Sequence, residues 1–120
     1  NQMSNRVWVV ATNFTLNAGG MVFVDERGYA RANGPGRGTN VASNGGSGGG
    51  GYGGKGGAGT GAGGQPYGAT NGPLEPGSGG GLEASLDVGK AGGGAVRIDA
   101  SGSVVAGTLW WTIRKLGLRA

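Results

Sequence analysis

The side chains that most often perform catalysis or hold metal ions are scarce in this 120-residue sequence. It contains no cysteine and no histidine, which excludes disulfide frameworks, zinc fingers, thiol nucleophiles and imidazole bases. None of the six carboxylates has the spacing of a calcium-binding loop. Asp25 and Glu26 are adjacent, so in a strand they would point to opposite faces. Because nothing identifies the facing pair that glycoside hydrolysis requires, the sequence favours a protein that is not an enzyme and needs no cofactor or metal ion.

Two short sequence motifs are weak evidence for a nucleotide site or a glycosylation site. Residues 49–55 fit the start of the phosphate-binding loop G-x-x-x-x-G-K, but Gly56 follows where a Ser or Thr hydroxyl would hold Mg²⁺. No helix-forming sequence comes next to offer its N-terminus to a phosphate. In a chain with 33 glycines, such a match is expected by chance. Asn13-Phe14-Thr15 fits a glycosylation sequon, and we interpret it as a turn.

Composition and charge limit the remaining classes. Hydrophobic residues make up 36% of the chain and charged residues 13%, which is little for an ordinary globular core. The net charge of +4 is concentrated in Arg114, Lys115 and Arg119. Only Lys55 is charged among residues 45–64, which argues against single-stranded nucleic acid as a partner. No apolar run approaches the ~20 residues of a membrane span.

The pattern along the chain predicts a single all-β domain over residues 1–120. Residues 6–33 form a first β segment, residues 34–81 a Gly-rich low-complexity segment, residues 82–113 a second β segment and residues 114–120 a basic tail. Strands are expected at 7–11, 14–18, 21–24, 96–100, 103–106 and 109–113, where β-branched and aromatic residues alternate with polar ones. One short helical turn could occur at 83–86. Short strands joined by short turns suit a β-solenoid, a meander or a β-sandwich-like arrangement.

A three-residue period runs through the Gly-rich segment. One register is glycine throughout, namely Gly45, Gly48, Gly51, Gly54 and Gly57. Three residues per turn is the period of polyproline II, which polyglycine can also adopt. Such helices have no internal hydrogen bonds, so a bare glycine face would allow neighbouring backbones to pair. This register is therefore a candidate glycine packing face, and a flexible loop remains the alternative. Tyr52 and Tyr67 are candidate aromatic contacts, either packed over bare backbone or exposed.

The order of blocks resembles a known group of proteins. Trp8–Ala11, Phe14–Gly19, Gly48–Gly59, Pro73–Gly81 and Gly92–Ile98 together resemble the glycine-rich repeat domains of large secreted bacterial surface proteins, of the autotransporter passenger and polymorphic outer-membrane type. The resemblance covers about residues 7–109 and implies a right-handed parallel β-helix. It also implies that Gly92–Ile98 contains one strand of a coil and that the glycine block is an insertion beside it. The C-terminal residues 109–116 depart from this pattern.

The glycine block is also similar to the glycine-rich domain of certain receptor tyrosine kinases, in which polyglycine helices pack together. No feature of a kinase accompanies it here.

These observations favour an extracellular or cell-surface structural module that self-associates. Strand edges and glycine faces would pair with copies of the chain or with neighbouring repeats of the same parent chain, as in a surface fibre or an adhesin stalk. A passive spacer within a giant adhesin is a further reading. The alternative is a surface that binds carbohydrate or ice, although the threonines at 12, 15, 39, 60 and 70 share no single spacing, which argues against ice. The candidate contact residues in the strands are Val7, Trp8, Val9, Val10, Val22, Phe23, Val96, Ile98, Trp110, Trp111 and Ile113.

Overall fold

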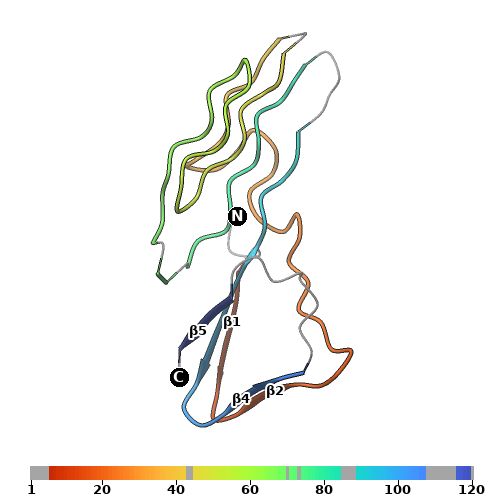
Figure 1. Ribbon diagram of the computed structural model, residues 1–120, viewed down its shortest axis with the longest axis vertical. Coiled ribbons are helices and arrows are strands. Elements are labelled where there is room, and N and C mark those ends of the chain that lie inside the picture. Colours follow the sequence, from red (N-terminus) through yellow and green to blue (C-terminus); the bar gives the residue numbers. More distant parts are fainter. Residues whose placement is uncertain are drawn as a thin grey trace.

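The protein is elongated, with its strands at one end and its glycine-rich segments at the other (Figure 1). The structure, a computed structural model, describes residues 6–42, 45–69, 71–72, 74–84, 89–107 and 116–119, the last of these as backbone only. Its extents are 51 × 27 × 25 Å. The strands therefore occupy one part of the long axis and the glycine-rich segments continue it.

The described residues contain five short strands, of which four form where β-branched, aromatic or alternating residues predict strands. They are β1 (Arg6–Ala11), β2 (Phe14–Leu16), β3 (Ala95–Ala100), β4 (Val104–Ala106) and β5 (Leu116–Arg119). No helix is present in the part of the chain that the structure describes. The expectation of a non-helical chain with short strands is confirmed at this level.

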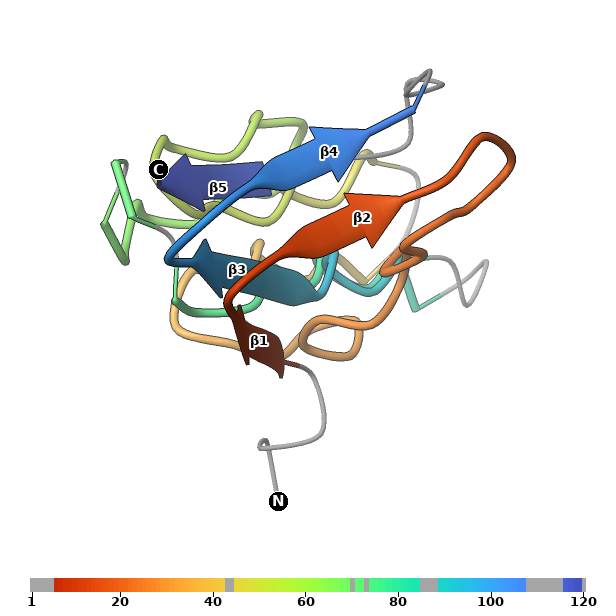
Figure 2. The ribbon, with the colours of Figure 1, turned by 90° about the horizontal axis from the view of Figure 1, so that it is seen from below.

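Within the described residues every pair of strands is parallel, and none joins two strands that are consecutive in sequence. One sheet has the order β1-β3-β5 and the other the order β2-β4. Viewed from below, β1, β3 and β5 lie one above another, with β2 and β4 stacked beside them (Figure 2). We call β1 with β2 the first rung and β3 with β4 the second rung. Because hairpin partners would be antiparallel, this arrangement excludes the meander.

The register shows how far apart in sequence the stacked strands are. Val96 of β3 pairs with Leu116 of β5, 20 residues further along the chain. Val7 of β1 pairs with Val96, 89 residues further along. The connection from the first rung to the second is therefore much longer than the connection from β3 to β5, and it contains the glycine-rich segments.

The two rungs are joined at their corners by hydrogen bonds. Residues 12–13 separate β1 from β2, and residues 101–103 separate β3 from β4. The Ser101 and Gly102 amides donate to the carbonyl oxygens of Ala11 and Thr12, at 3.1 and 2.7 Å. The Asn13 side-chain oxygen accepts from both the amide and the hydroxyl of Ser103, each at 2.9 Å. The corners thus satisfy polar groups that a tight turn would otherwise leave unpaired.

The apolar core is small and lies on one face of β3. Val96 and Ile98 are 5% and 2% exposed, because β3 has a strand on each side of it. Val7 and Val9 of β1 lie opposite them in the register and, by the two-residue period of a strand, on the same face. Among the side chains that the structure describes, Val96 and Ile98 are the two buried aliphatic ones, and both belong to the strands rather than to the glycine-rich half.

Two sequence-based expectations are wrong, and two others lie wholly or partly outside the described residues. Met21–Val24 is not a strand; the Val24 carbonyl accepts a hydrogen bond at 2.7 Å from the amide of Gly94, the residue before β3. Residues 116–119, expected in a basic tail, form β5 because Leu116 and Leu118 take the register positions of Val96 and Ile98. Glu83 forms an isolated bridge with Val41, and residues 85–86 of the helical turn expected at 83–86 lie outside the described residues. The expected strand at 109–113 lies outside the described residues.

Replacing Ile98 with alanine should lower the free energy of unfolding by about 2–5 kcal/mol, because the Ile98 side chain is enclosed in the core and the removed atoms would leave a cavity there. Urea denaturation followed by circular dichroism would measure the change. Val105→Ala is the matched control: Val105 is 53% exposed, and its truncation should change the free energy of unfolding by no more than about 0.5 kcal/mol. Equal effects of the two substitutions would contradict the position of the core.

Candidate functional site

The glycine-rich half is held together by backbone hydrogen bonds. We call this half the glycine bundle, and define it as residues 28–41, 45–67, 76–84 and 89–94. In one parallel series the amides of Gly61, Gly64 and Tyr67 donate to the carbonyl oxygens of Gly46, Gly49 and Tyr52, at 3.0, 2.9 and 2.6 Å. Both members advance by three residues from one bond to the next, which is the polyproline II period.

The same three-residue step recurs between other segments of the bundle. The Gly48 and Gly51 amides donate to the carbonyl oxygens of Thr39 and Gly36, at 3.1 and 2.7 Å, in an antiparallel sense. The Gly77 and Gly80 amides likewise donate to Gly93 and Lys90, at 2.8 and 2.9 Å. The bundle therefore extends beyond residues 34–81, the limits expected from composition, and reaches the residue before β3.

The candidate glycine face is divided by the structure into two parts. A Cβ atom built on Gly45, Gly48 or Gly51 would overlap Thr60, Ala62 or Gln65, respectively. Gly54 and Gly57 continue the same register after the chain turns, and a Cβ atom at either would meet nothing within 4 Å. Both are exposed. Only the first part of the predicted face is therefore a packing face within the molecule.

A second glycine register takes over the inward position after the turn. Cβ atoms on Gly56 and Gly59 would overlap the carbonyl oxygens of Gly49 and Gly46. The composition of the sequence could not have distinguished Gly56 from Gly57, because the difference depends on where the chain reverses. The turn at residues 52–54, where the Tyr52 amide donates to the Gly54 oxygen at 3.1 Å, makes that change.

Tyr52 and Tyr67 pack against each other instead of standing apart in solvent. Their ring centroids are 5.0 Å apart with an interplanar angle of 71°, an edge-to-face arrangement favoured by the ring quadrupoles. Both side chains are half-buried, and the Tyr67 hydroxyl donates to the Pro76 carbonyl. Burial raises the pKa of Tyr67, and a hydrogen bond with the Ser78 side chain opposes that rise. The two rings therefore form a packing contact within the glycine bundle rather than a pair of exposed contacts.

The edge of β1 is the most exposed apolar surface among the predicted contact strands. Within the described residues β1 pairs only with β3. Val7, Trp8 and Val10 are 50%, 64% and 74% exposed. An edge strand also has backbone groups that no strand pairs on its outer side. Together these features make β1 a candidate contact surface.

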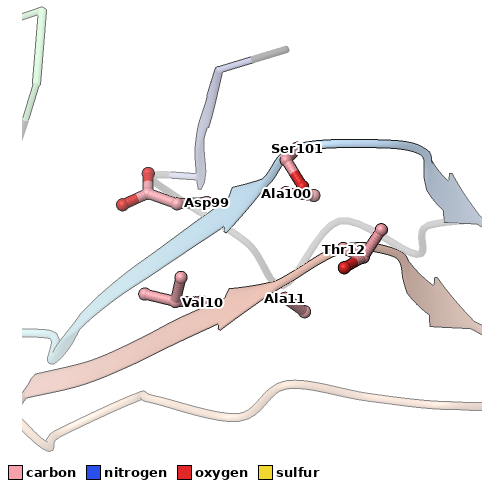
Figure 3. A pocket seen from close by; sticks show the side chains of 6 residues that line it. All are labelled: Val10, Ala11, Thr12, Asp99, Ala100 and Ser101. Atoms are coloured by element: carbon pink, nitrogen blue, oxygen red, sulfur yellow. The ribbon is translucent and has the colours of Figure 1, made fainter.

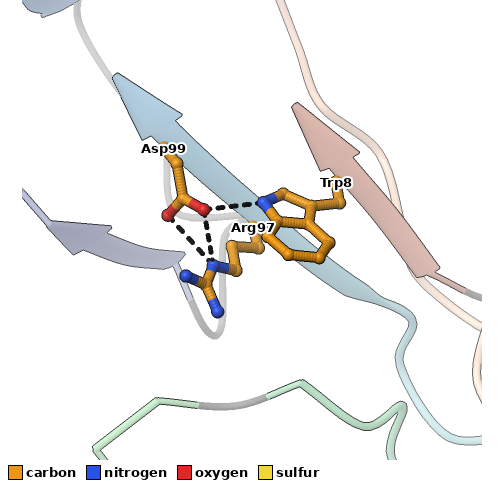
Figure 4. A network of polar contacts seen from close by, with 3 residues as sticks. All are labelled: Trp8, Arg97 and Asp99. Carbon is orange, nitrogen blue, oxygen red and sulfur yellow. Dashed lines mark hydrogen bonds and ion pairs between the residues drawn. The ribbon is translucent and has the colours of Figure 1, made fainter. Parts of the chain in front are cut away.

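A polar network fixes the indole of Trp8 on the outer face of the sheet (Figure 4). The indole N–H donates to Asp99 at 2.7 Å, and Nε of Arg97 donates to both Asp99 oxygens at 2.9 Å. The Arg97 guanidinium lies 4.7 Å from the indole centroid, a cation–π distance. The carboxylate that pairs with Arg97 is thus two residues away on the same strand, where side chains share a face.

A shallow depression lies beside this network. Val10, Ala11 and Thr12 line it from the first rung, and Asp99, Ala100 and Ser101 from the second (Figure 3). It is wide open to solvent, with a volume of about 550 Å³. Asp99, Thr12 and Ser101 thus all belong to the lining of one depression, and Asp99 also accepts the hydrogen bond of the exposed Trp8 indole.

The other predicted contact residues do not join these surfaces. Val22 is half-buried and Phe23 is 56% exposed, both outside any strand. Trp110, Trp111 and Ile113 lie outside the described residues. Among the residues that are described, no group of three carboxylates could hold a metal ion, and no helix is long and apolar enough to cross a membrane.

Comparisons with protein-family models, with curated proteins and with solved structures found no match to this chain. The functional argument therefore depends on the geometry of the strand edge and of the glycine bundle.

Adjacent glycines of the bundle should respond in opposite ways to the same substitution. Gly56→Ala should destabilise the protein by ~1–3 kcal/mol or more, because the new methyl group overlaps the Gly49 carbonyl and forces the backbones apart. Gly57→Ala should be neutral or stabilise by ~0.4–1 kcal/mol, because its site is open and the unfolded chain loses freedom. Thermal denaturation of both variants measures the difference. If Gly57→Ala is as damaging as Gly56→Ala, the packing direction described here is wrong.

Proposed function

We propose that the protein is an extracellular structural module that self-associates through its strand edges, as part of a surface fibre or an adhesin stalk. The observation that carries the proposal is the edge of β1. It has exposed Val7, Trp8 and Val10 next to a central strand, β3, that is paired on both sides. A contiguous apolar edge with unpaired backbone groups is a surface that a further strand can cover.

The proposed architecture is a β-solenoid with a bundle of polyglycine II helices inserted in one coil. The parallel register and the joined corners support stacked coils. The separation of 20 residues between paired positions of β3 and β5 is a short coil. The separation of 89 residues between β1 and β3 is then that coil enlarged by an insertion. The three-residue step of the hydrogen bonds supports polyglycine II as the structure of the insertion.

The cell-surface location is supported by composition alone. The chain has no cysteine, few charges and abundant glycine, and its blocks resemble those of secreted bacterial surface proteins. A core made of backbone hydrogen bonds has no thiol and no titrating imidazole, so its stability would not depend on the redox poise or the mildly acidic pH of its surroundings.

The purified chain should gain mass as its concentration rises from the micromolar to the millimolar range. Static light scattering would record the weight-average mass, and negative-stain electron microscopy of the same samples would show the form of the assemblies. A chain that stays folded and monomeric throughout this range would contradict self-association as its role. Circular dichroism on each sample separates ordered association from aggregation of unfolded chain.

Carbohydrate binding at Trp8 is a second candidate function. It is favoured by the combination of an exposed indole with Asp99, Thr12 and Ser101 around one depression, since aromatic rings stack on sugars and carboxylates accept bonds from their hydroxyl groups. Trp8→Ala should then abolish retention on immobilised oligosaccharides, whereas Phe23→Ala, which removes an equally exposed ring elsewhere, should not. Failure of the unmodified chain to bind any member of an oligosaccharide panel would remove this candidate.

A further inference from the structure

Paired residues of β1 and β3 show how much of a side chain is covered when a strand lies on both sides instead of one. Val7 and Val96 lie opposite each other in the register, yet Val7 is 50% exposed and Val96 is 5% exposed. The difference arises because β3 has a strand on both sides and β1 has a strand on one side only among the described residues. One added strand would therefore bury the remaining half of Val7 and extend the existing core.

The edge of β1 has none of the features by which natural edges avoid such pairing. Between Arg6 and Ala11 there is no proline, no lysine and no glycine, and the register with β3 is continuous, without a bulge. Arg6 is the single charged residue, and it lies at the first position of the strand. An edge with this composition is open to pairing.

The position of the glycine bundle determines which way a second copy can approach. The bundle continues from one end of the strands only (Figure 1), and it reaches beyond β5 in the stacking direction (Figure 2). Three paired strands span only about 10 Å between the outer backbones, whereas the two shorter extents of the molecule are 27 and 25 Å. A copy stacked in parallel on β5 at strand spacing would bring its own bundle against the first bundle. An antiparallel copy on β1 places the two bundles at opposite ends.

We propose that two copies of the chain pair through β1, antiparallel and about a two-fold axis. This inference rests on the proposed self-association and specifies its geometry. The result is a continuous six-stranded sheet with the order β5-β3-β1-β1-β3-β5. The interface is isologous, so it closes at two copies.

The sequence of β1 is self-complementary in this arrangement. Residues that point to the same face lie opposite one another across the axis, so the apolar side chains of β1 in one copy face those of the other, and the two Arg6 side chains lie at opposite ends of the paired strands. Trp8 is already fixed by Asp99 and Arg97, so little side-chain freedom is lost on pairing. One six-residue strand per copy is a small interface, and we expect reversible dimers rather than permanent ones.

Sedimentation equilibrium of the full chain tests this geometry. The unmodified protein should reach a plateau at twice its mass of 11.6 kDa. Val10→Lys should raise the dissociation constant at least about tenfold, because it puts a charge into each of the two strands that pair, as natural edge strands do to prevent pairing. Asp99 lies opposite Val10 within the chain and gives the lysine a counter-charge, so the fold should be retained. Met21→Lys adds the same charge at a 68% exposed side chain outside the strands and should leave the dissociation constant unchanged.

A distance measurement distinguishes the antiparallel pair from a parallel one. The chain has no cysteine, so Gly57→Cys provides a single labelling site where no atom lies within 4 Å. Dipolar spectroscopy between two spin labels should give a distance well beyond the 27 Å width of the molecule, because the bundles point apart. A distance near or below that width would overturn the antiparallel arrangement.

The possible outcomes separate this inference from the proposed function. Growth without a plateau, or association that Val10→Lys does not weaken, overturns the two-fold pairing through β1 and leaves self-association standing. A monomer at every concentration overturns both. A plateau at two copies, weakened by Val10→Lys and not by Met21→Lys, supports both.

Discussion

The structure depends on backbone hydrogen bonds between neighbouring segments, because a glycine-rich segment with a three-residue period makes none within itself. A helix with three residues per turn leaves every amide and carbonyl group to be satisfied by a neighbouring segment or by water. In the glycine bundle the neighbours come close enough that side chains are excluded, as at Gly48 and Gly56, where a Cβ atom would overlap a carbonyl oxygen. Glycine is thus required at the inward positions because the segments bind one another directly through their backbones.

The stacked rungs supply what the bundle cannot provide for itself. Glycine loses more conformational entropy on folding than any other residue, and the bundle buries few apolar side chains in return. The parallel pairing of β1 with β3 joins residues 89 positions apart, and the corner bonds of Asn13 and Ser103 hold the two rungs in register. The rungs therefore close the long connection and reduce the number of arrangements open to the segments within it.

Local periodicity predicted much of the fold, and long-range pairing could not be predicted. The two-residue alternation of Val96, Ile98 and Ala100 located β3, and the three-residue glycine register indicated the step of the hydrogen bonds. The assignment of Leu116–Arg119 to a tail was wrong because four residues are too few to show a strand period, and Arg119 follows the charged Arg114 and Lys115. The place of Leu116–Arg119 in the sheet is set by pairing with β3, in which Leu116 and Leu118 lie opposite Val96 and Ile98.

The candidate sites show the same limit in more detail. Trp8 was identified as a strand contact, but its fixed orientation depends on Asp99, 91 residues away. The bond between Arg97 and Asp99 could have been predicted, because residues two apart on a strand share a face. That Gly56 faces inward while Gly54 faces open space could not have been predicted. Both residues are glycine, and the difference depends on the turn at residues 52–54.

A core built from peptide groups has a thermodynamic consequence. The heat capacity change of unfolding increases with the apolar surface exposed and decreases with the polar surface exposed. Unfolding the glycine bundle exposes mainly peptide groups and few aliphatic side chains. The heat capacity change of this chain should therefore be small for its length, and its stability curve correspondingly flat. Such a protein would lose little stability on cooling, since the weakening of hydrophobic contacts at low temperature affects only the small cluster around Ile98.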